Sequence, residues 1–227
     1  ILTIHATNVI GLGACQVVVS FLEGIESLKT EYDKVICYAP VAGPVAEYAP
    51  KTDKLEMRPF RRMGPKALSR VMECIVPSLF FEIGEHLIVL GDVPLRTRRR
   101  QLVLVHQPHL QYPRVNRRVG RTIIFRLMRT LTRHNASYAD CVITQTSAMA
   151  SGLRESYRDW DSRDCIKVIG QPPPSWFTLS SSASSFQEDR RGLRLFYPAA
   201  GYPHKNHIIF EGLLTLDLKG LIDRLVL

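Results

Sequence analysis

The stretch QLVLVHQPH, residues 101–109, places a nearly continuous apolar run directly before a histidine. A second run of this kind, HLIVLGDVP, occupies residues 86–94. Short apolar runs without regular polar alternation are typical of parallel strands that are buried on both faces of a sheet. The two runs therefore predict strands of a parallel sheet in an α/β protein.

Further strand-length runs alternate with helical patterns on both sides of these two. We expect strands at 1–8, 34–40, 54–60, 140–146 and 165–171, and helices at 14–30, 65–83, 116–136 and 147–157. Pro77 lies inside one helical pattern and is expected to kink or split that helix. The alternation predicts a doubly wound parallel sheet, that is, one Rossmann-like domain over residues 1–172.

The composition changes after this domain. Residues 173–192 are rich in proline and serine and predict a linker. The stretch LRLFYPAA that follows predicts a new strand, and NHIIFEGLLTL predicts a new helix. About 35 residues cannot bury a core alone. Residues 193–227 are therefore expected to be the start of a second domain, in a chain that is clipped at both ends.

The charge of the chain is concentrated in one segment. The 227 residues carry a formal net charge of +9. Eleven arginines and no acidic residue lie between Arg96 and Arg133. A local basic field of this kind fits nucleic acid, an anionic membrane surface or a phosphorylated substrate.

The five cysteines form no CxxC pair, and their number is odd. Reduced thiols in the core of a cytoplasmic protein are therefore expected, rather than a disulfide framework or a zinc ribbon. The sequence has no uncharged apolar run of about 18 residues, which argues against a membrane-spanning helix. Its first residues also lack the basic segment of a signal peptide.

Three stretches carry residues with possible chemistry. Gly11 and Gly13 follow the first strand and allow a tight turn and close approach of a ligand. The alternatives are a plain strand-to-helix turn and a dinucleotide-binding loop. The third glycine of the dinucleotide-binding pattern is absent from this sequence. His106 follows an apolar strand, where α/β sheets hold their ligands, or is a core histidine. Lys205 occupies the turn in FYPAAGYPHKNH, residues 196–207, either as a phosphate ligand or as a solvated lysine.

Other polar residues have simpler interpretations. His109 forms an HxxH pattern with His106, but no Glu or Cys lies near it, so no metal and no cofactor are predicted. Asp140 is expected to be a structural capping residue. The predicted helix 116–136 has one apolar face, and its arginines either form a solvated face or contact an anionic membrane or the acceptor. The arginines assigned to this contact are Arg117, Arg118, Arg121, Arg126 and Arg129.

Five motifs in order resemble the retaining glycosyltransferases of family 4, which have the GT-B fold of two Rossmann-like domains. They are GLG at 11–13, VLVHQP at 103–108, ASYADCVITQTSAMASGL at 136–153, IKVIGQPPPSWF at 166–177 and FYPAAGYPHKNH at 196–207. The resemblance implies that Lys205 and the loop with Gly11 and Gly13 bind the donor phosphates. It also places His106 near the transferred sugar. Ala200 stands where many members have an arginine, so a second cation either comes from elsewhere or is missing.

The function implied by the resemblance is transfer of a sugar from a nucleotide-sugar donor to a glycan or a lipid-linked acceptor, in bacterial surface polysaccharide synthesis. The enzyme would be cytoplasmic and peripheral on the inner face of the plasma membrane. Residues 1–227 alone are expected to be inactive, because the glutamate pair of the family is missing. The alternatives are a non-catalytic module that binds polyanions through its arginines, and a sugar-nucleotide epimerase. Nucleic acid is not an expected partner, because no aromatic residues are interleaved with the arginines.

Overall fold

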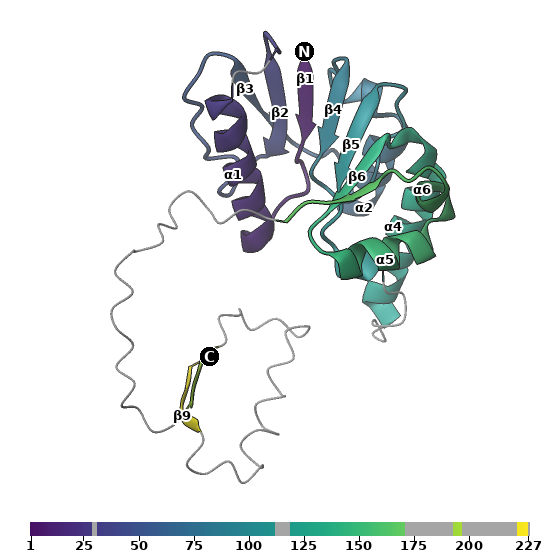
Figure 1. Cartoon of the computed structure of the whole chain (residues 1–227). Helices are drawn as coiled ribbons and strands as arrows, with labels where there is room; N and C mark the ends of the chain where they lie inside the picture. Colours follow the sequence, from purple (N-terminus) through teal and green to yellow (C-terminus); the bar gives the residue numbers. More distant parts are fainter. Residues whose placement is uncertain (29–30, 112–118, 171–192, 197–221, 227) are drawn as a thin grey trace. The chain divides into compact units, whose positions relative to one another are not determined.

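The computed structural model describes residues 1–28, 31–111, 119–170, 193–196 and 222–226 (Figure 1). The chain divides into two units, Ile1–Phe177 and Thr178–Leu227. The first unit contains the sheet and its helices. The second contributes two described strands.

The first unit is built on a sheet of seven strands that all run parallel. Their order is β3-β2-β1-β4-β5-β6-β7. The strands are β1 (Leu2–His5), β2 (Val35–Pro40), β3 (Leu55–Phe60), β4 (His86–Val89), β5 (Arg100–Leu104), β6 (Cys141–Thr144) and β7 (Ile166–Val168). All seven predicted strands are therefore present, and the Rossmann-like α/β fold is confirmed.

The helices follow the predicted positions, and two of their boundaries lie at prolines. They are α1 (Leu12–Ser27), α2 (Lys66–Ile75), η1 (Pro77–Leu79), α3 (Pro108–Gln111), α4 (Val119–Asn135), η2 (Ala136–Tyr138), α5 (Ser147–Ser156) and α6 (Arg158–Ser162). Pro77 splits the predicted helix 65–83 into α2 and η1, as expected for a residue without a backbone N–H. The predicted strand 101–109 ends at Leu104, and Pro108 begins α3, because proline suits the first turn of a helix.

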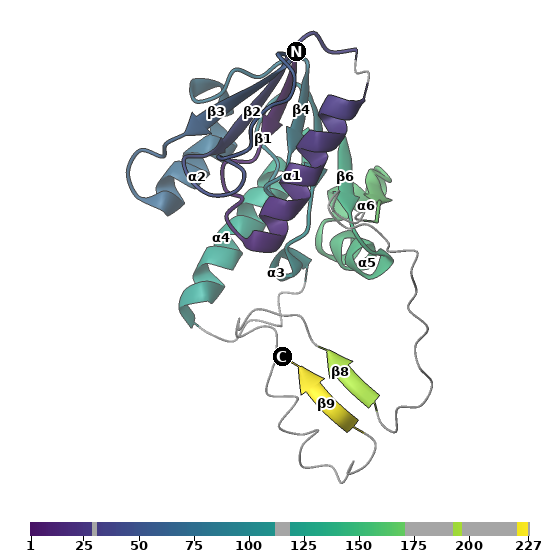
Figure 2. The ribbon, with the colours of Figure 1, turned by 90° about the vertical axis from the view of Figure 1, so that its left-hand side faces the viewer.

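The two faces of the sheet pack against different helices (Figure 2). One face meets α2, α4, α5 and α6 in a core that includes Leu87, Val103 and the fully buried Trp160. The other face meets α1 through Val18 and Leu22. In the described part of the chain, α1 is the helix on this second face.

The second unit contains β8 (Leu193–Phe196) and β9 (Ile222–Val226), which pair in parallel. The strand predicted from residue 193 is confirmed over its first four residues. β9 was not predicted. The helix predicted over 206–216 lies outside the described residues.

Candidate ligand site at the carboxyl edge of the sheet

The strand order places a topological switch point between β1 and β4. The strands numbered before β4 extend to one side of this point and the strands after β4 to the other. Open α/β sheets bind ligands at such a point, outside the carboxyl ends of the strands. The loops that follow β1, β4 and β5 are therefore the candidate site.

The loops after β1 and β4 hold each other closely. The Asn8 side-chain N–H donates to the Gly91 carbonyl at 3.2 Å, and Arg70 Nη2 donates to the same oxygen at 3.1 Å. A Cβ atom at Gly91 would lie 2.2 Å from Asn8 Oδ1, so any larger residue here would force the Asn8 side chain to move. The geometry of the switch point is therefore fixed by contacts from the loop after β1 and from α2.

Asp92 follows Gly91 and is the central polar residue of the site. Its backbone has φ = 68°, in the left-handed region that asparagine and aspartate tolerate best after glycine. Its side chain is buried, and Oδ1 accepts the backbone N–H of His106 at 2.8 Å and of Gln107 at 3.0 Å. Burial raises the pKa of Asp92, and the nearby His106 and these two hydrogen bonds oppose that rise. Asp92 thus ties the loop after β4 to the loop after β5.

His106, predicted as a site residue, lies two residues beyond the end of β5. Its Nδ1 is buried and lies 3.3 Å from Asp92 Oδ1, without the alignment of a hydrogen bond. The side chain as a whole is 22% exposed. Nδ1 therefore faces the protein interior, while part of the side chain remains exposed.

Next to this site lies a buried charge cluster that the sequence did not predict. The Glu73 carboxylate is fully buried; it accepts Arg62 Nε at 2.7 Å and the Thr7 hydroxyl at 2.9 Å, and lies 3.3 Å from Arg70 Nη1. Burial alone would raise the pKa of Glu73, but the contacts with His5 and both arginines outweigh it and hold the pKa far below its usual value. The cluster supports Arg70, which in turn holds Gly91.

His5 completes this cluster from the end of β1. Its Nε2 lies 3.1 Å from the Thr7 hydroxyl and 3.7 Å from Glu73. Burial lowers the pKa of His5 to about 4, although the nearby Glu73 carboxylate acts in the opposite direction. His5 is therefore neutral at physiological pH. No motif pointed to it, because its burial depends on packing against Phe81, which is distant in the sequence.

Gly11 and Gly13 are at the start of α1, as predicted, but the predicted tight turn is not required there. Gly11 has φ = −77°, which any residue adopts, and Gly13 also lies outside the left-handed region. Within the described residues, no atom lies within 4 Å of a Cβ built at either position. The first turn of α1 has no side-chain cap at Gly11, so open space surrounds its start.

The arginines that were assigned to a membrane or acceptor contact differ in their exposure. Arg126 is exposed on α4. Arg129 is 8% exposed, and its Nη1 donates to the His109 carbonyl at 2.8 Å. This burial does not fit a membrane contact by Arg129, because its guanidinium turns inward to hold the loop after β5; an acceptor contact by Arg129 stays a prediction. Side-chain positions are not described for Arg121, and Arg117, Arg118 and Lys205 lie outside the described residues.

The apolar face of α4 is only partly covered. Leu131 is buried and Met128 packs against the core, as the helical pattern suggests. Ile123, Ile124 and Leu127 are 64%, 55% and 40% exposed. The first described turns of α4 therefore present large apolar side chains next to the exposed Arg126.

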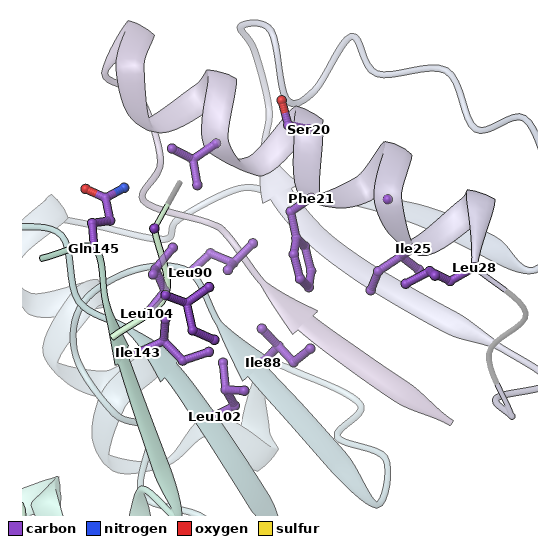
Figure 3. Close-up of a pocket in the computed structure, with 14 residues that line it drawn as sticks. Ser20, Phe21, Ile25, Leu28, Ile88, Leu90, Leu102, Leu104, Ile143 and Gln145 are labelled. Carbon is purple, nitrogen blue, oxygen red and sulfur yellow. The ribbon is translucent and has the colours of Figure 1, made fainter. Parts of the chain in front are cut away.

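An apolar groove of about 360 Å³ lies between α1 and strands β4, β5 and β6 (Figure 3). Phe21 and Ile25 point from α1 toward Ile88 and Leu102 on the sheet. The full lining is Val17, Ser20, Phe21, Gly24, Ile25, Leu28, Ile88, Leu90, Leu102, Leu104, Ile143, Gln145, Ile169 and Gly170. This groove was not predicted, because the apolar strand runs look the same whether one face or both are covered.

Among the described residues, no three His, Cys, Asp or Glu side chains are grouped so that they could hold a metal ion. No described helix is both long and apolar enough to cross a membrane. All five cysteines are free thiols, as predicted.

No protein-family model matches the sequence, and no curated protein matches it. The structure by itself shows a parallel, Rossmann-like α/β sheet with a polar site at its switch point.

Proposed function

We propose that this chain carries the acceptor-side domain of a retaining glycosyltransferase of the GT-B type. One observation carries the proposal: His106 lies at the carboxyl edge of β5, in contact with Asp92 of the loop after β4, at the switch point of the sheet. A histidine at this position is the feature that the family resemblance assigns to the transferred sugar. The order of the seven parallel strands supports the same assignment.

The chemistry needs two kinds of contact. The sugar hydroxyls must be held in place by hydrogen bonds, and the negative charge that develops on the departing nucleoside diphosphate must be stabilised. His106 would serve the sugar. Free backbone N–H groups at the start of α1, beside Gly11, are suited to the diphosphate because a helix N-terminus attracts anions. Lys205 is proposed as a further phosphate ligand, and no step requires a metal.

The second unit would begin the nucleotide-sugar domain. β8 and β9 are parallel, and 25 residues separate them in the sequence. Parallel neighbours need a crossover connection of a dozen or more residues, usually a helix. This pairing supports a second unit of the β-α-β type, with Lys205 in the connection after β8.

We further propose that α4 contacts an anionic membrane at the cytoplasmic leaflet, where a lipid-linked acceptor would be reached. The exposed Ile123, Ile124 and Leu127 beside Arg126 support this contact. Amphipathic helices of this composition lie in the membrane interface, and each basic residue adds attraction to anionic lipid. The exposed aliphatic side chains would gain little from contact with nucleic acid. They therefore favour a membrane over a polyanion as the partner of α4.

The test is sugar transfer by the natural protein that contains this chain, with a panel of nucleotide sugars and vesicles that hold anionic lipid and a polyprenyl-phosphate acceptor. His106→Ala is expected to lower kcat/KM by about 100-fold or more, as for the loss of one preorganised polar contact. His134→Ala is the matched control, because His134 is exposed at the end of α4. Epimerised nucleotide sugar without transfer, or equal activity of both variants, would contradict the proposal.

A further inference from the structure

We infer that Asp92 is a positioning residue that keeps the proton of His106 on Nδ1, so that Nε2 accepts a hydrogen bond from a hydroxyl group of the substrate. The proton placement follows from the geometry of the two side chains. The role in sugar binding rests in addition on the proposed function.

The Asp92 oxygen that faces the His106 ring is Oδ1. Asp92 Oδ1 accepts two backbone N–H groups, those of His106 and Gln107. An oxygen that accepts two hydrogen bonds presents lone pairs and not a proton. The same Oδ1 lies 3.3 Å from His106 Nδ1. The ring nitrogen therefore faces an acceptor oxygen that carries no proton.

The position of the proton on the His106 ring depends on this oxygen. In a neutral imidazole one nitrogen carries the proton and the other carries a lone pair. A lone pair on Nδ1 would face the Asp92 lone pairs at close range, inside a buried region where repulsion is poorly screened. A proton on Nδ1 turns this repulsion into attraction. Such second contacts are what sets the tautomer of a histidine.

Asp92 is itself held in place, as a positioning residue must be. Asp92 is 4% exposed, and its left-handed backbone is one that few residue types adopt. The preceding Gly91 is fixed by Asn8 and Arg70 on its carbonyl oxygen. The carboxylate consequently points toward the loop after β5 before any ligand is present.

The proton placement determines the type of group that His106 recognises. Because Nδ1 carries the proton of the neutral ring, Nε2 carries a lone pair. A lone pair accepts hydrogen bonds from hydroxyl groups and repels phosphate oxygens. The substrate group at His106 is therefore a sugar hydroxyl, and the diphosphate lies elsewhere in the site.

The tautomer is measured by two-bond ¹H–¹⁵N correlation on the full chain labelled at histidine nitrogen, with the His106 signals assigned from His106→Gln. Wild-type protein is expected to show the Nδ1–H form. Asp92→Asn keeps an oxygen for the backbone bonds but attracts the proton less, so the Nδ1–H fraction should fall. Asp92→Gly suits the left-handed backbone and removes the oxygen, so the Nε2–H form should dominate.

Asp140→Asn is the matched control. Asp140 Oδ2 also accepts a backbone N–H, that of Gln101 at 2.6 Å, in the loop before β6. This variant should leave the His106 tautomer unchanged. A wild-type Nε2–H form, or the same tautomer in all Asp92 variants, would overturn the inference.

Transfer kinetics provide the second measurement. Asp92→Asn should lower kcat by about 10- to 100-fold with little change in the KM of the acceptor, as expected when one hydrogen bond to the reacting sugar is lost. A wild-type kcat in a variant with an altered tautomer would overturn the positioning role. If the natural protein transfers no sugar, the proposed function fails, while the tautomer measurement still decides the proton placement.

Discussion

The two faces of the sheet are covered to different extents, although both carry apolar side chains of similar kinds. On β4, Leu87 points into the core beneath α2, α4, α5 and α6 and is 1% exposed. Its neighbour Ile88 points to the α1 side and lines the groove. On β5, Val103 is fully buried, whereas Leu102 and Leu104 line the groove.

This difference shows what apolar strand runs do and do not predict. The runs over 86–94 and 101–109 led us to expect strands buried on both faces. In the described structure that expectation is confirmed on one face and is wrong on part of the other, where Ile88, Leu102 and Ile143 are only half-buried. An apolar run thus indicates which residues avoid water but not which element covers them.

The largest effect is expected at the centre of the covered face. Trp160→Ala should destabilise the protein by about 3–5 kcal/mol, because it removes the largest fully buried side chain. It also leaves the Ala136 carbonyl without the indole N–H at 3.0 Å. Urea unfolding at pH 7 measures the change. Trp160→Phe, which keeps most of the volume, should lose less than half as much.

A matched pair of leucines tests the comparison directly. Leu87→Ala should lower the free energy of unfolding by about 2–5 kcal/mol, as for a large-to-small change in a closed core. Leu102→Ala should lower it by less than about 1.5 kcal/mol, because its side chain is half-buried in the described structure. Equal losses in urea unfolding would mean that the groove is covered in solution.

The covered face should also govern the loss of stability in acid. The pKa of His5 in the folded state is lowered to about 4 from 6.5, so the unfolded chain binds a proton that the folded protein excludes. Stability from this residue is complete above pH 6.5 and is lost as pH falls toward 4, by on the order of 1–3 kcal/mol. His5 faces Thr7, Glu73, Arg62 and Arg70.

The check is urea unfolding from pH 7 to pH 4 for the wild type and His5→Gln. The variant should have a flatter pH dependence above pH 4, whatever its stability at pH 7. His134→Gln, at an exposed site, is the control and should leave the slope unchanged. None of the side chains that line the groove titrates, so the groove does not contribute to the pH dependence of stability. An unchanged slope for His5→Gln would assign the acid sensitivity to another group.

The smallest effect on stability is expected in the groove itself. Leu104→Gln should change the free energy of unfolding by about 1 kcal/mol or less and should weaken binding of an apolar fluorescent dye several-fold. Ile124→Gln, which changes the exposed apolar face of α4, is the matched control. If the α4 variant alone reduces dye binding, the accessible apolar surface is on α4 and not in the groove.

Much of the fold was visible in the sequence for physical reasons. Strands and helices leave local signals, namely apolar runs and helical spacing, and Pro77 and Pro108 end elements because their nitrogen carries no hydrogen. The position of His106 was predictable too, because the end of an apolar strand marks the edge of the sheet. These signals depend on neighbouring residues only.

The rest of the site depends on contacts between distant segments. Glu73 meets Thr7, 66 positions away, and Asp92 meets His106, 14 positions away. No local pattern marks a carboxylate for such a contact. The arginines of α4 show the same limit, since the spacing of Arg126 and Arg129 does not tell that one is exposed and the other donates to the His109 carbonyl.

The central claim is that the carboxyl edge of the sheet, and not the groove, binds the sugar-transfer substrates. Photolabelling of the natural protein with a photoactivatable nucleotide sugar, followed by mass spectrometry, tests it most directly. We expect labels on the loops around Asn8 to Gly13, Asp92 and His106, and unlabelled nucleotide sugar should compete them away. Competed labels confined to the groove, or no competed label in residues 1–170, would contradict the account.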